Sequence, residues 1–192
     1  MGLRSRRRRQ SSVRKFIIVG LLISVALLVF QFIQTASNQA FKPLTKGDKI
    51  PDTLQYTRIN NQAVNLLNTA KEKPVVLIYY QGGSSTDCVI HLNELNQIQS
   101  DIQAAGYQLI AVSPDSTSVL DTTQKENNLM YMLASDASLQ GAKYFGIIDQ
   151  INGKQITKPS VFVINNRGVI VFAHTDSNTT QRLSTDAILG VL

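Results

Sequence analysis

Cys88 is the one cysteine of the 192-residue chain, and its thiol is the side chain best suited to nucleophilic or redox chemistry. It lies near the start of a helical pattern, after the polar run Ser84-Ser85-Thr86. A thiolate is a strong nucleophile, and the positive end of a helix dipole favours it, whereas the neighbouring Asp87 disfavours it. The hydroxyl of Ser85 can either form a hydrogen bond with such a sulfur or act only as the N-cap of the helix. The pattern leaves open a reactive thiol or a buried, inert one.

Few other side chains suggest chemistry. One cysteine excludes an intramolecular disulfide, and the two histidines, His91 and His174, are far apart in the chain and show no metal-ligand spacing. We therefore expect neither a metal nor a cofactor. His91 follows Cys88 by one helical turn and could contact it, although an ordinary surface histidine is the simpler interpretation.

The elements around Cys88 form a β-α-β pattern. The run 75–80 is aliphatic and aromatic, which is typical of a buried strand, and a second such run covers 107–112. Between them, apolar residues recur at helical spacing, at Val89, Leu92, Leu95, Ile98 and Ile102. Short joints predict parallel strands, so Cys88 should lie at the carboxyl edge of the sheet, where sites of α/β proteins form.

The rest of the domain alternates helix and strand patterns. We predict a hairpin over 53–59 and 63–67, a helix over 117–128, a short strand over 129–133 and a helix over 138–145. A loop is expected at 147–157, a second antiparallel hairpin over 160–164 and 169–173, and a last helix at 185–192 after the N-cap candidate Ser184.

The N-terminal part has a different composition. Residues 1–15 form a basic tail without acidic residues, and 16–33 are uncharged and long enough for a transmembrane anchor. Residues 34–46 are expected to be a linker, and 47–192 the folded domain. The basic tail predicts a cytoplasmic N-terminus, an anchor in membrane lipid and a domain on the extracytoplasmic side. A cleaved signal peptide or a mitochondrial transit peptide is the alternative.

The charge of the chain belongs mostly to this tail. The formal net charge is +6, and without the basic residues of 1–15 the acidic and basic side chains nearly balance. A nearly neutral domain lacks the basic face that phosphate binding requires, so we expect no nucleic-acid partner.

Five motifs in order resemble the thioredoxin-like superfamily, in its peroxiredoxin-like branch, the alkyl hydroperoxide reductase and thiol-specific antioxidant (AhpC/TSA) family. They are Gly47-Asp48-Lys49-Ile50-Pro51-Asp52, Tyr79-Tyr80-Gln81-Gly82, the strand 107–113, Leu133-Ala134-Ser135-Asp136, and Pro159-Ser160-Val161-Phe162-Val163-Ile164 with Arg167-Gly168. The resemblance implies an α/β, thioredoxin-like, three-layer fold with a mixed central β-sheet flanked by helices, preceded here by one transmembrane helix.

The resemblance also implies site residues. Ser85-Thr86-Asp87-Cys88 is similar to the family's Thr/Ser-x-x-Cys, which makes Cys88 the peroxide-attacking cysteine and Ser85 its hydroxyl partner. Tyr80 and Thr86 are further candidates for lining the site. Gln81 replaces the family's usual proline, and Lys158-Pro159 stands where its arginine is expected. Lys158 is thus a candidate cation, and Pro159 resembles the cis-proline that faces the active loop.

Two functions follow from this resemblance. The first is a membrane-anchored thiol antioxidant that reduces peroxides through one cysteine, with an external thiol as reductant. The second is a binding protein that retains the fold without the chemistry, or a redox-assembly protein that forms a mixed disulfide with a client through Cys88. A serine at position 85 excludes the two-cysteine exchange chemistry of disulfide reductases.

Overall fold

The computed structural model describes residues 18–31, 43–151, 153–176 and 182–192, without the side chains of residues 151 and 154. The chain divides into two compact units, residues 1–40 and 41–192. In the first, residues 18–31 form one helix. No helix within the described residues is long and apolar enough to cross a membrane. The ends of the predicted anchor, 16–33, lie outside those residues.

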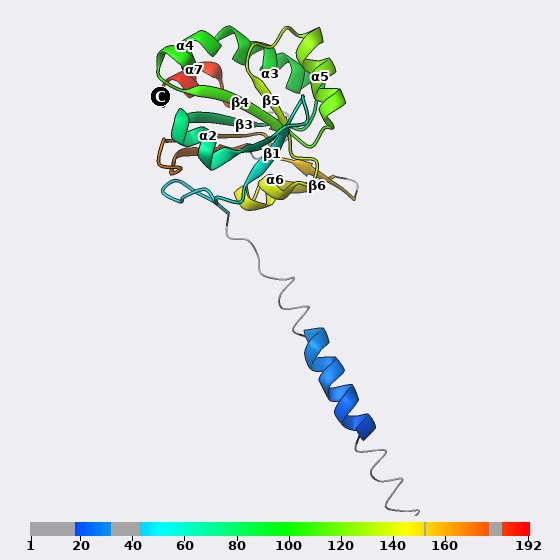
Figure 1. The fold of residues 1–192 in the computed structure, drawn as a ribbon. Helices are drawn as coiled ribbons and strands as arrows, with labels where there is room; N and C mark the ends of the chain where they lie inside the picture. Colours follow the sequence, from blue (N-terminus) through cyan, green and yellow to red (C-terminus); the bar gives the residue numbers. More distant parts are fainter. Residues whose placement is uncertain (1–17, 32–42, 152, 177–181) are drawn as a thin grey trace, which may run out of the picture. The chain divides into compact units, whose positions relative to one another are not determined.

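The second unit is built on a seven-stranded sheet of order β2-β1-β5-β4-β3-β8-β9 (Figure 1). β3 and β5 pair with β4 in parallel, whereas β1, β2, β8 and β9 add antiparallel pairs, so the sheet is mixed as predicted. The strands are β1 Gln55–Arg58, β2 Ala63–Asn65, β3 Val75–Tyr79, β4 Gln108–Ser113, β5 Met132–Ser135, β8 Ser160–Ile164 and β9 Ile170–Thr175.

Helices cover both faces of this sheet and complete three layers. They are α2 Leu66–Glu72, α3 Thr86–Gln97, α4 Gln99–Ala104, α5 Thr117–Glu126, α6 Gln140–Phe145 and α7 Thr185–Leu189. Side chains of α2 and α6 pack into the core on one face, and those of α3, α4, α5 and α7 into the core on the other.

The central strand β3 determines where the site forms. All its residues are buried: Val75, Leu77 and Tyr79 face one core, and Val76 and Ile78 face the other. A strand covered on both faces reads as a continuous apolar run, which is why this segment is recognisable in the sequence. Because β3 and β4 are parallel, their carboxyl ends meet at one edge of the sheet, and the predicted β-α-β unit is confirmed.

The structure corrects several element predictions. The predicted loop 147–157 contains the hairpin of β6 Ile148–Ile151 and β7 Lys154–Thr157. Its Asn-Gly pair is the strongest short hairpin signal, and the loop prediction gave it too little weight. Leu66 and Leu67 begin helix α2, capped by Asn65, rather than ending a strand. The helix after Cys88 is divided at Ile98 into α3 and α4.

Candidate functional site

Cys88 lies in the first turn of α3, directly beyond the carboxyl end of β3. Ser85 is the N-cap of this helix, and its Oγ accepts a hydrogen bond from the backbone N–H of Cys88 at 3.4 Å. Since that oxygen is the acceptor there, the hydroxyl hydrogen remains free to point elsewhere. This contact is to the backbone of Cys88 and not to its sulfur, and capping explains why a serine suits this position.

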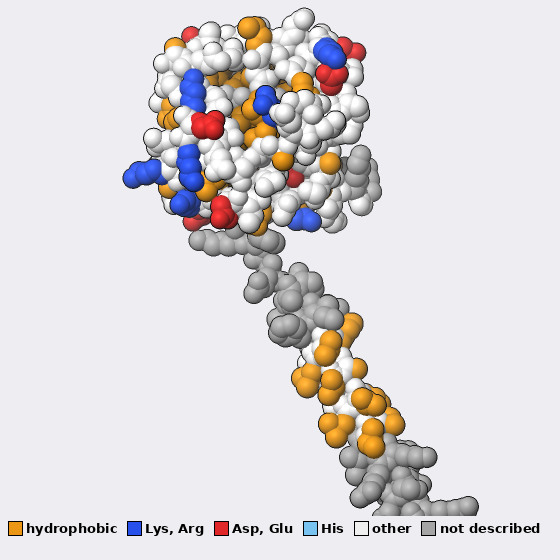
Figure 2. Space-filling model, in the orientation of Figure 1, with side chains coloured by type: hydrophobic (Ala, Val, Ile, Leu, Met, Phe, Trp, Pro, Cys, Tyr) orange, Lys and Arg blue, Asp and Glu red, His pale blue; other side chains and the backbone are white. Residues whose placement is uncertain are grey.

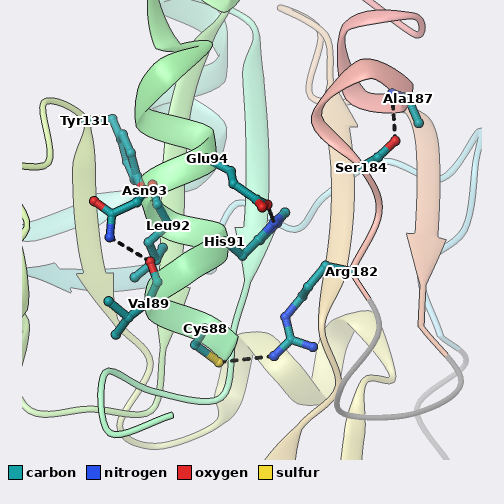
Figure 3. A network of polar contacts seen from close by, with 10 residues as sticks. All are labelled: Cys88, Val89, His91, Leu92, Asn93, Glu94, Tyr131, Arg182, Ser184 and Ala187. Carbon is teal, nitrogen blue, oxygen red and sulfur yellow. Dashed lines mark hydrogen bonds and ion pairs between the residues drawn. The ribbon is translucent and has the colours of Figure 1, made fainter. Parts of the chain in front are cut away.

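The cation at the sulfur is Arg182, which we did not predict. Its Nη2 donates to Cys88 Sγ at 3.3 Å, and Figure 3 shows the guanidinium directed at the sulfur. Arg182 lies between β9 and α7. A guanidinium is permanently charged and only weakly hydrated, so it stabilises an anion at a partly buried site.

Lys158 does not take this role. Its ammonium pairs with Asp149 of β6 at 3.7 Å, and the cation that contacts the sulfur is Arg182. The Pro159 expectation is also corrected, because no cis peptide bond occurs in the described part of the chain. The trans bond is the lower-energy form of an X-Pro peptide, and the Pro159 carbonyl accepts the N–H of Asp176.

The Cys88 side chain is completely buried, in a core cluster that also contains Tyr80 and Leu92. Thr86, the first residue of α3, is exposed instead. The burial of the sulfur means that the Arg182 guanidinium and the apolar side chains of this cluster surround it rather than bulk water. In such surroundings charged contacts act more strongly than they do in water.

His91 is buried as well, with 4% of its surface exposed, so the interpretation as a surface histidine is wrong. Its Nδ1 lies 3.5 Å from Glu94 Oε2, one turn further along α3 (Figure 3). Burial lowers the pKa of His91, the hydrogen bond and charge of Glu94 raise it, Arg182 lowers it, and Asp176 raises it. The net direction is downward, so the imidazole beside this site is neutral at neutral pH.

Tyr80 belongs to the site through its position rather than through a tight contact. Its backbone donates to Val112 O at 3.0 Å and accepts from Thr157 Oγ1 at 2.9 Å, which fixes the residue at the end of β3. Burial raises the pKa of Tyr80, while the Ser113 hydroxyl lowers it and the charges of Asp115 and Cys88 raise it. The phenol of Tyr80 is therefore neutral, and it belongs to the same core cluster as Cys88.

No group of histidine, cysteine or carboxylate side chains suited to a metal ion occurs within the described residues. A thiol at a helix start, with a hydroxyl at the N-cap and a guanidinium on the sulfur, is equipped to form a thiolate and to stabilise negative charge beside it.

The fold and this site define a thioredoxin-like protein with a single cysteine at the start of the helix that follows the central strand. The sequence profile described as the AhpC/TSA family matches residues 46–173, and the chain belongs to this family.

Curated relatives are peroxiredoxins by name. One from Mycobacterium tuberculosis is 28% identical over 146 residues, covering 73% of this chain and 91% of the relative. Another, from Haemophilus influenzae, is 25% identical over 134 residues, with 67% and 84% covered.

Solved structures share the fold. Peroxidoxin BcpB from Mycobacterium tuberculosis superposes with a TM-score of 0.69 at 19% identity, over 77% of this chain and 96% of that one. The reduced Prx3 of Vibrio vulnificus, solved in complex with hydrogen peroxide, gives a TM-score of 0.71 at 18% identity, over 77% and 97%.

Proposed function

We propose that the protein is a thiol peroxidase that reduces peroxides through Cys88 alone, with Ser85 as the hydroxyl partner of the sulfur. The observation that supports this most is the 3.3 Å contact between Arg182 and Cys88 Sγ. Such a contact favours the thiolate, which is the form of cysteine that attacks peroxides. Family membership supports the same reaction class.

In the proposed first step the Cys88 thiolate attacks the nearer oxygen of a peroxide ROOH. An S–O bond forms and the O–O bond breaks, so sulfur loses two electrons and the peroxide is reduced. The attacked oxygen is the terminal one, which carries the hydrogen, so Cys88 becomes the sulfenic acid directly, while the departing alkoxide takes up one proton and leaves as ROH. The Arg182 guanidinium neutralises the negative charge that moves from sulfur to oxygen.

The second step needs an external thiol, because the chain has no other cysteine. One reductant thiol displaces hydroxide from the sulfenic sulfur, giving water and a mixed disulfide with Cys88. A second reductant thiol attacks this disulfide, releasing the oxidised reductant as its own disulfide and restoring the Cys88 thiol. The cycle thus consumes two thiols for each peroxide reduced.

We also propose that the N-terminal segment anchors the domain in a membrane, with the N-terminus on the cytoplasmic side. Helix 18–31 supports this, because its residues are exposed throughout and nearly all are apolar, as Figure 2 shows for the visible face. The arginine-rich residues before it fit the orientation rule for basic flanks. Carbonate washing of membranes from cells expressing the full chain tests this, since release of the protein into the wash would contradict an anchor.

The complete burial of Cys88 favours a second candidate, a binding or redox-assembly protein that keeps the fold. Because Cys88 is buried in this structure, a peroxide reaches its sulfur only when the first turn of α3 opens locally. A catalytically inactive protein would need no such opening.

A coupled assay separates the two candidates. The full chain in detergent is mixed with hydrogen peroxide or an organic hydroperoxide and dithiothreitol, and peroxide consumption is followed over time. A peroxidase consumes many equivalents of peroxide, and Cys88→Ser abolishes this turnover. Consumption no faster with the protein than with Cys88→Ser would support the binding protein instead.

A further inference from the structure

The loop that carries Cys88 into α3 is made of small residues with little side-chain anchorage. Gly82 and Gly83 follow Gln81, and Gly82 has a φ of +142°, a conformation that side-chain-bearing residues rarely adopt. Within the loop, the N–H of Ser85 donates to Gly82 O at 3.3 Å. Glycines have the largest conformational entropy to lose, so such a loop holds one geometry only if other elements fix it.

Asp115 supplies such a restraint from the bend that follows the neighbouring strand, β4. Its Oδ2 accepts the backbone N–H of Gly83 at 2.8 Å, across 32 positions of sequence. Its carboxylate also fills the space beside Gly82, where an added Cβ would lie 2.8 Å from Oδ1. The Thr123 hydroxyl of α5 occupies the space that a side chain at Gly83 would need. The two glycines are therefore held between a carboxylate and a helix.

Asp115 is itself firmly oriented. Ser113 Oγ donates to the same carboxylate oxygen at 3.1 Å and accepts the Asp115 N–H at 3.2 Å. Ser135 Oγ donates to the Asp115 carbonyl. These bonds connect the loop to the carboxyl ends of β4, the parallel neighbour of β3, and of β5, which pairs with β4 in parallel on its other side.

We propose that Asp115 is a positioning residue, which holds the Gly82-Gly83 loop so that Cys88 starts its helix facing Arg182. It touches neither the sulfur nor a peroxide in this role. The proposal builds on the proposed function for its effect on peroxide reduction, whereas the restraint on the loop is independent of any activity.

The test compares Asp115→Ala and Asp115→Asn in the full chain. Alanine removes the acceptor, whereas asparagine can place its amide oxygen where Oδ2 lies and accept both the Gly83 N–H and the Ser113 hydroxyl, so it preserves the contacts without the charge. Asp121→Ala is the matched control, because it removes an exposed carboxylate of α5 that pairs with Lys125. Hydrogen–deuterium exchange of peptides covering residues 81–87 reports the loop, and trapping of the sulfenic acid at Cys88 reports the reaction.

We expect Asp115→Ala to speed exchange in this loop, and to slow sulfenic acid formation, by about tenfold each, with near wild-type values for Asp115→Asn and Asp121→Ala. Unchanged exchange in Asp115→Ala would overturn the proposal, as would an Asp115→Asn variant as impaired as alanine. If Asp115→Ala speeds exchange in the loop but leaves the rate of sulfenic acid formation unchanged, the claim that Asp115 positions Cys88 is overturned. If the wild type forms no sulfenic acid, the proposed peroxidase function fails, and the exchange data alone then decide the role of Asp115.

Discussion

Arg182 and Cys88 lie 94 positions apart in the chain, yet the guanidinium of one donates to the sulfur of the other at 3.3 Å. A hydrogen bond to a charged partner contributes about 1.5–3 kcal/mol, and about 1.4 kcal/mol corresponds to a tenfold change in an equilibrium or rate. We therefore predict that Arg182→Met slows alkylation of Cys88 at neutral pH by about tenfold or more. The rate of iodoacetamide labelling in the folded protein, followed by intact mass, measures this.

Arg182→Lys should retain only part of the effect, because an ammonium is more strongly hydrated and lacks the planar fork of a guanidinium. Arg167→Met is the matched control, since Arg167 is exposed in the turn between β8 and β9. Equal labelling rates for wild type and Arg182→Met would mean that the contact does not activate the thiol.

Ser85 is the N-cap of α3 and the proposed hydroxyl partner of Cys88, and a comparison with another N-cap residue separates these two roles. Ser85→Ala removes the N-cap of α3, which should lower the free energy of unfolding by about 1 kcal/mol. It should also slow the labelling of Cys88, because the proposed hydroxyl partner of the sulfur is lost. Asn65→Ala removes the cap of α2, which packs on the opposite face of the sheet, and should cost stability without changing Cys88. Chemical denaturation and the labelling assay test both effects.

His91 should make stability sensitive to acid. Its pKa lies below the ordinary value because burial disfavours the imidazolium, so the unfolded chain binds a proton there that the folded protein does not. The free energy of unfolding therefore falls as the pH drops below about 6.5, the pKa of an exposed histidine. His91→Gln should lose less stability than wild type between about pH 7.5 and pH 5.5, measured by urea denaturation. Parallel curves for both proteins would contradict this.

Tyr56 and Tyr79 form a buried pair in the other core, with their hydroxyl oxygens 2.6 Å apart. Burial raises the pKa of both phenols, so the pair shares a neutral hydrogen bond. Replacing either by phenylalanine leaves one buried hydroxyl without this partner, at a cost of about 1–3 kcal/mol. The double variant should lose less than the two single losses combined, which a double-mutant cycle measures. Additive losses would show that the hydroxyls do not stabilise each other.

The sequence predicted the local part of the site well. Cys88, its cap Ser85 and the preceding strand are neighbours in the chain, so apolar runs and capping residues suffice to place them together. The parallel pairing of β3 and β4 followed from the short joints of one β-α-β unit. The mixed sheet and its helical layers were predicted from the resemblance to the thioredoxin-like superfamily.

The remaining parts depend on contacts that local patterns do not report. Arg182 reaches Cys88 only because β8 and β9 return the chain to that face of the sheet, and no spacing rule links positions 88 and 182. The prediction of a surface histidine at position 91 was wrong, because the expected apolar face ran through Val89, Leu92 and Leu95 and did not include His91. In the structure α3 instead buries Cys88, His91, Leu92 and Leu95, and it ends before Ile98.

The most direct test of the proposed function is the product at Cys88 after a single peroxide addition. The reduced full chain is treated with one equivalent of hydrogen peroxide in the presence of a dimedone-type probe, and the adduct is located by peptide mass spectrometry. The proposed function predicts a sulfenic acid adduct at Cys88 that forms within seconds in wild type and about tenfold more slowly in Arg182→Met. An unmodified Cys88 that reacts only after the domain is unfolded would contradict it.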